Sequence, residues 1–128
     1  MMTIVANPTP AEMEILEVLW SEGPSTVRHV HGRLEGRRGT GYTTILKLMQ
    51  IMAGKRLLTR DESSRSHVYA PAIGQGDVQG SMLSTLVDRA FSGSTSALVM
   101  RALQSRRASA EELAEIRELL ATLEEDEG

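Results

Sequence analysis

Residues 42–71 read YTTILKLMQIMAGKRLLTRDESSRSHVYAP. Their apolar residues recur at helical spacing, at Ile45, Leu48, Met49 and Met52, which predicts an amphipathic helix over about residues 42–55. Residues 57–60 and 67–70 then predict two short strands, joined by a turn that carries an arginine. A recognition helix followed by a wing has this layout: the helix lies in the DNA major groove and the hairpin contacts the adjacent backbone. The stretch therefore predicts a DNA-binding regulator.

Two further helices are predicted before this stretch. Residues 9–12 make a strong helix start, because Thr9 can cap the helix, a proline follows, and a glutamate completes a capping box. A second helix is predicted from Thr26, its cap, to about Gly36. Three helices and a two-stranded wing make residues 1–72 a winged helix-turn-helix domain. The predicted fold class is mainly α with a small β wing.

Residues 73–128 predict a separate helical region. Helices are expected over about residues 75–92, 97–104 and 109–123, and the acidic tail from residue 124 is expected to be frayed. Their apolar stripes are too thin to enclose a core, so a second copy of the chain is the predicted partner and this region is the predicted dimerisation arm. The residues expected at this homodimer interface are Leu83, Leu86, Val87, Phe91, Leu98, Val99, Leu113, Ile116, Leu120 and Leu123.

Charge is divided unequally along the chain. The net charge is −3, yet residues 28–65 carry nine basic and three acidic side chains, and the chain from residue 71 onward carries five arginines and ten acids. Such a division can mark a nucleic-acid-binding face joined to a part with another role. Two solvated surfaces of opposite sign are the alternative explanation.

The composition excludes several classes of protein. The chain has no cysteine, which excludes disulfides, thiolate metal sites and cysteine nucleophiles. No apolar run approaches the ~20 residues that a membrane span needs, and the first residues lack the pattern of an export signal. We therefore expect a cytoplasmic protein.

The predicted DNA contacts centre on the polar face of the helix over residues 42–55. Lys47 can reach a guanine edge or a phosphate, and Gln50 can pair with adenine. Thr43 and Thr44 can contact phosphates or a thymine methyl. Phosphates, which position a protein without specifying sequence, are the expected targets of Tyr42, Thr26, Arg28 and Lys55. The expected contacts from the wing are Arg60, Arg65 and His67.

Catalysis has almost no support in the sequence. His29 and His31 are two residues apart on a predicted helix, so their side chains point in different directions. The glutamates of residues 111–118 lie on one helix, which is typical of a solvated face, whereas an acid/base pair needs carboxylates from separate elements. We expect no enzyme activity, no cofactor and no metal.

Four motifs follow one another along the chain. They are Thr9-x-x-Glu12 leading to Leu19-Trp20, Thr26-Val27-Arg28-x-Val30-His31, Tyr42-Thr43-Thr44-Ile45-x-x-Leu48-Met49-Gln50, and Arg65-x-His67-x-Tyr69-x-Pro71. With this order and spacing, the chain resembles the penicillinase-repressor family, the BlaI, MecI and CopY type of regulator. The remaining half also matches that family in length.

The resemblance implies a homodimeric transcriptional repressor on a palindromic operator, often with TACA/TGTA half-sites; β-lactam resistance is one theme of the family. In several members a membrane sensor-protease cleaves the dimerisation arm. The equivalent region here, around Arg101 and Ala102, lacks the Asn-Phe pair of that scissile bond. The copper-responsive members use a cysteine cluster, which this chain lacks. The family commonly has a basic residue where Ile51 stands.

Two other functions fit the sequence. A winged-helix module can bind proteins without reading DNA, because fold does not determine function, and Ile51 and the acidic net charge favour this alternative. A regulator with broad sequence tolerance would bind DNA with a small ratio of specific to non-specific affinity.

Overall fold

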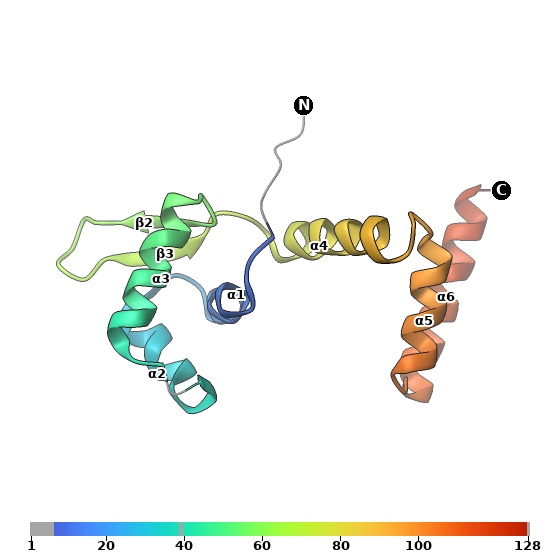
Figure 1. The fold of residues 1–128 in the computed structure, drawn as a ribbon, viewed down its shortest axis with the longest axis horizontal. Coiled ribbons are helices and arrows are strands. Elements are labelled where there is room, and N and C mark those ends of the chain that lie inside the picture. The colour runs from blue at the N-terminus through green and yellow to red at the C-terminus, as the bar shows by residue number, and fades with distance from the viewer. Residues whose placement is uncertain (1–6, 39, 128) are drawn as a thin grey trace. The chain divides into compact units, whose positions relative to one another are not determined.

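The computed structural model describes residues 7–38 and 40–127, and the chain divides into two compact units, Met1–Ser84 and Thr85–Gly128. The first unit contains α1 (Pro10–Glu22), β1 (Ser25–Thr26), α2 (Val27–Arg38), α3 (Tyr42–Gly54), β2 (Leu58–Asp61) and β3 (Val68–Pro71). The division falls inside α4 (Gln75–Ala90), and the second unit adds α5 (Thr95–Ser105) and α6 (Ala110–Glu127). Three helices, a hairpin and three more helices follow in the predicted order (Figure 1). The predicted boundary after residue 72 stays a prediction.

The first helix begins at the predicted capping box. The Thr9 hydroxyl accepts a hydrogen bond from the Glu12 amide at 3.2 Å, and the Glu12 carboxylate accepts one from the Thr9 amide at 2.9 Å. These two bonds satisfy backbone donors that a helix start leaves free. Gly23 ends α1 with a φ of 89°, a conformation that glycine adopts without strain, and its amide donates to the Leu19 carbonyl.

The wing belongs to a three-stranded sheet, whereas the sequence predicted two strands. The order is β1-β3-β2, with both neighbours antiparallel to β3, and Ser25 pairs with Tyr69. The strand β1 was missed because two residues are too few to show an alternating pattern. The Thr26 hydroxyl accepts from the His29 amide at 3.1 Å, so the predicted cap of α2 also ends β1.

The core of the first unit is aliphatic and lies between α1, α2, α3 and the sheet. Its fully buried side chains include Ile15, Leu16, Leu19, Val30, Met49, Met52, Leu57 and Tyr69. Trp20, at the end of α1, is only half-buried, and its indole N–H donates to the Ile73 carbonyl at 3.0 Å. This bond ties α1 to the segment that leaves the sheet.

The second unit has helices but little interior. The helices α5 and α6 are described along their whole length and contain no buried residue. Ser94 caps α5, and a second capping box joins Ser109 and Glu112 at the start of α6. The acidic tail was expected to be frayed, but α6 continues through it to Glu127; Gly128 lies outside the described residues. Within the described part of the chain, no helix is long and apolar enough to cross a membrane.

A buried carboxylate joins the start of α1 to the end of α3. The Glu12 side chain is 3% exposed, and it accepts a hydrogen bond from the Lys55 ammonium at 2.7 Å. Burial raises the pKa of Glu12, but the hydrogen bond and charge of Lys55 and the hydrogen bonds of Thr9 outweigh burial and lower it below 4.5. The ion pair therefore helps to place α3 within the unit.

Replacing Glu12→Gln is expected to lower the free energy of unfolding by about 1–3 kcal/mol near neutral pH, because the amide cannot balance the Lys55 charge. Since the folded-state pKa is lowered, the stabilisation is present above about pH 4.5 and is lost as the pH falls through that lowered pKa. Urea unfolding of wild type and variant, at fixed protein concentration and falling pH, measures the difference.

The matched control is Glu17→Gln, since Glu17 is exposed on the same helix and its replacement should change stability little. A stability loss in Glu12→Gln that does not shrink with falling pH would contradict the role of an ionised Glu12.

Candidate nucleic-acid interface

The third helix has one buried face and one exposed polar face. Ile45, Met49 and Met52 are buried, as predicted, and Leu48 is half-buried. The opposite face exposes Thr43, Thr44, Lys47, Gln50 and Ile51. Burial of the apolar residues thus turns the predicted base-reading side chains toward solvent.

Two side chains of α2 hold Tyr42 at the start of α3. The Arg28 guanidinium carbon lies 6.0 Å from the centre of the Tyr42 ring, a cation–π distance. The His31 ring meets the Tyr42 ring edge-on, with 5.9 Å between ring centres. Arg28 and Tyr42 are both predicted DNA contacts; His31 was not predicted as one, and the structure places it against Tyr42. The one signal in the sequence is that His31 follows Arg28 by three residues, a spacing that places both side chains on the same side of a helix.

A cleft lies between the wing on one side and α3 and the first residues of α2 on the other. Its volume is about 290 Å³. Six of the predicted DNA-contacting residues line it: Thr26, Arg28, Tyr42, Gln50, Arg65 and His67. Thr26, Arg28, Tyr42 and Gln50 come from β1, α2 and α3, whereas Arg65 and His67 come from the turn between β2 and β3. Folding therefore brings side chains that are distant in sequence around one concave surface.

Other basic residues near this surface are already paired. The ammonium of Lys55 is engaged by Glu12, as described above. The guanidinium of Arg60 donates to the Glu62 carboxylate at 2.8 Å, and its hydrogen bond with Tyr69, followed by the Glu62 charge, raises the pKa of Arg60. Among the described residues, Arg28, Lys47 and Arg65 form no ion pair.

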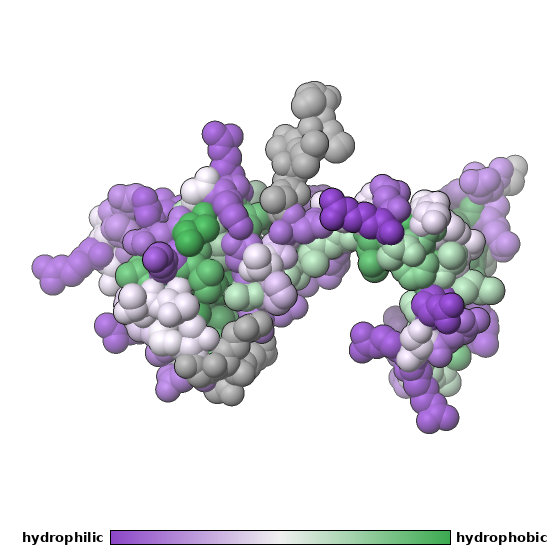
Figure 2. Space-filling model, in the orientation of Figure 1, coloured by the Kyte–Doolittle hydropathy of each residue, from purple (hydrophilic) through white to green (hydrophobic). Residues whose placement is uncertain are grey.

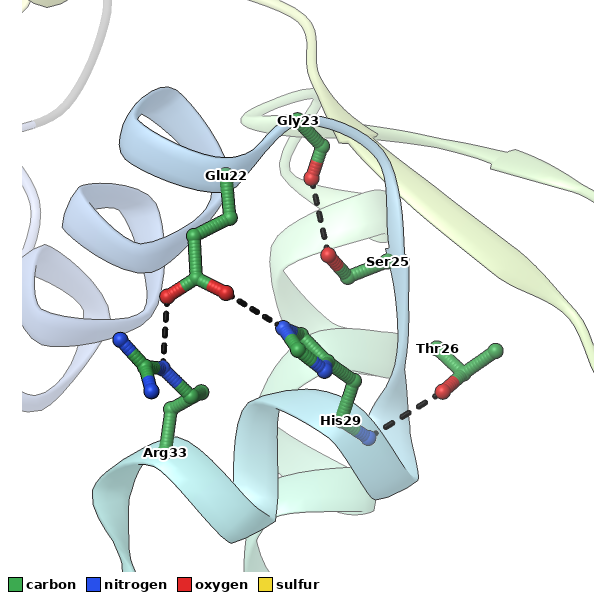
Figure 3. Close-up of polar contacts among 6 residues, drawn as sticks. All are labelled: Glu22, Gly23, Ser25, Thr26, His29 and Arg33. Atoms are coloured by element: carbon green, nitrogen blue, oxygen red, sulfur yellow. Dashed lines mark hydrogen bonds and ion pairs between the residues drawn. The ribbon is translucent and has the colours of Figure 1, made fainter.

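A carboxylate at the end of α1 clamps α2 (Figure 3). The Glu22 side chain faces the His29 ring and the Arg33 guanidinium, each at 2.6 Å, from residues one turn apart on α2. The hydrogen bond with His29 is the main reason that the pKa of Glu22 is lowered. Figure 3 also shows the Ser25 hydroxyl donating to the Gly23 carbonyl, which shapes the turn between the two helices. The clamp orients the helix that carries Arg28 and His31.

The predicted dimerisation residues lie on α4, α5 and α6, except Phe91, which directly follows α4. Five are exposed (Leu83, Leu86, Val99, Leu120 and Leu123), and five are half-buried (Val87, Phe91, Leu98, Leu113 and Ile116). Figure 2 shows hydrophobic surface over α5 and the adjoining end of α4. Exposed apolar side chains that gather in one place are typical of a protein-interaction surface.

Comparison with known proteins defines the class to which this fold and surface belong. The sequence profile of the penicillinase repressor family matches residues 8–122. The chain is 36% identical over 119 residues to the transcriptional regulator BlaI of Mycobacterium tuberculosis, covering 91% of this chain and 85% of that protein.

Solved structures agree with this assignment. The DNA-binding domain of the repressor BlaI is 25% identical, with a TM-score of 0.51, over 60% of this chain and 93% of that domain. Bacillus licheniformis BlaI, a monomeric form in complex with the blaP half-operator, shares the fold at 24% identity and a TM-score of 0.51, over 59% of this chain and 93% of that one.

The chain therefore belongs to the penicillinase-repressor family, and it is a DNA-binding transcriptional repressor. The family consists of transcriptional repressors, which are not enzymes, so the prediction that this protein is not an enzyme is confirmed. The winged-helix fold and the family resemblance are confirmed as well.

If Arg28 contacts a phosphate as predicted, replacing Arg28→Gln is expected to weaken binding to any duplex and to reduce the slope of log affinity against log salt by about 1. Fluorescence anisotropy over a range of salt concentrations measures both quantities. The control is Arg107→Gln, an exposed arginine of the second unit, which should leave the slope unchanged. Equal slopes for wild type and Arg28→Gln would show that Arg28 does not contact a phosphate.

Proposed function

We propose that the protein binds an inverted-repeat operator as a homodimer and blocks transcription, with α3 of each protomer in the major groove of one half-site. The observation that carries this proposal is the exposed polar face of α3 beside the cleft that the wing encloses. An α-helix fits the major groove, where each base pair presents a distinct set of donors and acceptors.

The side chains divide into base readers and phosphate binders. Lys47 and Gln50 on the exposed face of α3 are the proposed base readers, and Thr43 and Thr44 lie on the same face. The proposed phosphate contacts around the cleft are Thr26, Arg28, Tyr42, Arg65 and His67. DNA contacts by Lys55 and Arg60 stay predictions, since a phosphate would compete with the carboxylate that already pairs with each side chain.

The solved BlaI complex supports half-site recognition. In that complex a monomeric form is bound to a half-operator. If one monomer of this chain likewise occupies one half-site, a dimer joins two weak interactions, because the second half-site binds at high effective concentration. Dimerisation then determines whether the operator is occupied.

The apolar surface of the second unit supports a second copy as the partner. Leu86, Leu120 and Leu123 are 48%, 53% and 50% exposed in the single chain. Burying a leucine fully is worth about 1.5–3 kcal/mol, so covering the exposed half of each would contribute about 1 kcal/mol per residue. Repeated over two protomers, this is a substantial stabilisation of a symmetric interface.

A membrane sensor-protease as the releasing partner stays a prediction from the family resemblance. Arg101 and Ala102 lie inside α5, so cleavage between them would require local unwinding of that helix. Cytoplasmic localisation and a link to β-lactam resistance genes stay predictions as well.

The decisive experiment is selection of random duplex DNA by the purified protein at ~150 mM salt, followed by sequencing of the bound fragments. An inverted repeat is the expected result. Enrichment of no motif, with binding lost at that salt, would overturn the proposal and favour a protein-interaction module instead.

Replacing Lys47→Ala or Gln50→Ala is expected to cost about 1–3 kcal/mol of binding on the selected operator and less on random DNA. Competition binding with the two duplexes measures the ratio. The matched control is Gln104→Ala, since Gln104 is exposed on α5. Equal losses on both duplexes would show that Lys47 and Gln50 do not read bases.

Replacing Leu120→Asp or Ile116→Asp is expected to dissociate the dimer, because each places a charge in the proposed apolar interface. Analytical ultracentrifugation at about 10 µM protein measures the mass. Ala114→Asp is the matched control, since Ala114 is exposed on α6 away from the Ile116 and Leu120 stripe. A dimer that survives both interface substitutions contradicts the assignment of α6 to the interface.

A further inference from the structure

One apolar side chain interrupts the polar face of α3. Ile51 is 45% exposed and belongs neither to the hydrophobic core nor to the partly buried residues packed against it. In α3, which is described over its whole length, Tyr42 is the other exposed large hydrophobic side chain. Tyr42 has ring contacts with Arg28 and His31, so Ile51 is the apolar side chain of this face that the fold does not use.

Ile51 stands in the same row as two proposed DNA contacts. Thr44, Lys47 and Ile51 are spaced at i, i+3 and i+7, which places them on one side of the helix. Lys47 and Ile51 are four residues apart, which is about 6 Å along the helix axis. Figure 2 shows hydrophobic surface over α3 among hydrophilic side chains. If α3 lies along the major groove, as proposed, Ile51 faces the duplex on the same side as Lys47.

The chemistry of the major groove determines what an isoleucine can recognise there. Phosphates and most base edges offer charge or hydrogen-bonding groups, for which an aliphatic side chain has no partner. The apolar group on a base edge in this groove is the C5-methyl of thymine. Burial of that methyl against Ile51 removes apolar surface of both partners from water.

We infer that Ile51 is a specificity-determining residue that reads the C5-methyl group of one thymine in each half-site. The inference rests on the proposed function and extends it to a thymine close to the base pair that Lys47 contacts. Unlike a contact from a basic residue, this contact depends on the base sequence and releases no counterions, so it adds to specificity without adding to the salt dependence.

Deoxyuridine substitution tests the inference, because it removes the methyl and leaves the hydrogen-bonding edge intact. The probe is the duplex recovered by selection with the full chain, resynthesised with deoxyuridine in place of each thymine in turn. For one thymine per half-site, the wild-type Kd should rise about fourfold, the factor expected for one buried methyl-sized group. The Ile51→Ala variant should bind the thymine and uridine duplexes equally.

A matched variant separates the methyl contact from a general weakening of binding. Lys47→Ala should bind more weakly overall but keep the fourfold response to uridine, because Ile51 is still present. Ile51 is exposed, so its replacement is expected to leave the circular dichroism spectrum and the unfolding midpoint unchanged.

The outcomes distinguish this inference from the proposed function. A selected motif whose thymines all tolerate uridine overturns the role of Ile51 alone. The same holds for an Ile51→Ala protein that responds to uridine at every thymine where the wild type responds. Selection that enriches no motif overturns both the operator proposal and the role of Ile51.

Discussion

Burial of one face of α3 is the constraint on which the rest of the first unit depends. Ile45, Met49 and Met52 pack into the core that α1 and α2 provide, and the helix cannot turn without exposing them. Successive residues in a helix are rotated by about 100°, so a shift of one residue would remove Met49 from the core at a cost of about 1.5–3 kcal/mol. The same constraint orients Lys47, Gln50 and Ile51 outward.

The sheet is small, and its attachment to the helices makes the wing a fixed wall of the cleft. An isolated hairpin is at best marginally stable in water, but here β3 lies between β1 and β2, and Tyr69 on β3 is almost completely buried. β1 ends at Thr26, whose hydroxyl caps α2, so the sheet continues directly into the helix that carries Arg28. This arrangement accounts for the proximity of Arg65 and His67 to Tyr42 across the cleft.

Some basic residues of the first unit pair with a carboxylate, and others, such as Arg28 and Lys47, form no ion pair within the described part of the chain. Lys55, Arg33 and Arg60 each face a carboxylate and contribute to the positions of the helices and the wing. The exposed pairs of Arg33 and Arg60 contribute little stability individually, whereas Lys55 pairs with the buried Glu12; all three pairs orient long side chains and withdraw them from other partners. The charge counted along residues 28–65 therefore overstates the charge available to DNA.

The sequence by itself determined the order of the helices and the hairpin, the face that α3 buries, and the capping box of α1. These features depend on neighbours a few residues apart, which periodicity and capping patterns report directly. The family and its repressor activity also followed from motifs in order.

Only the tertiary structure decided the partners of Glu12 and Glu22, the third strand, and the contact of His31 with Tyr42. Lys55 illustrates the difference: the sequence predicted a phosphate contact for it and gave no sign that its ammonium lies against a glutamate 43 residues away. Such pairs join residues that are distant in sequence, and no local pattern records them, because their approach depends on how the helices pack.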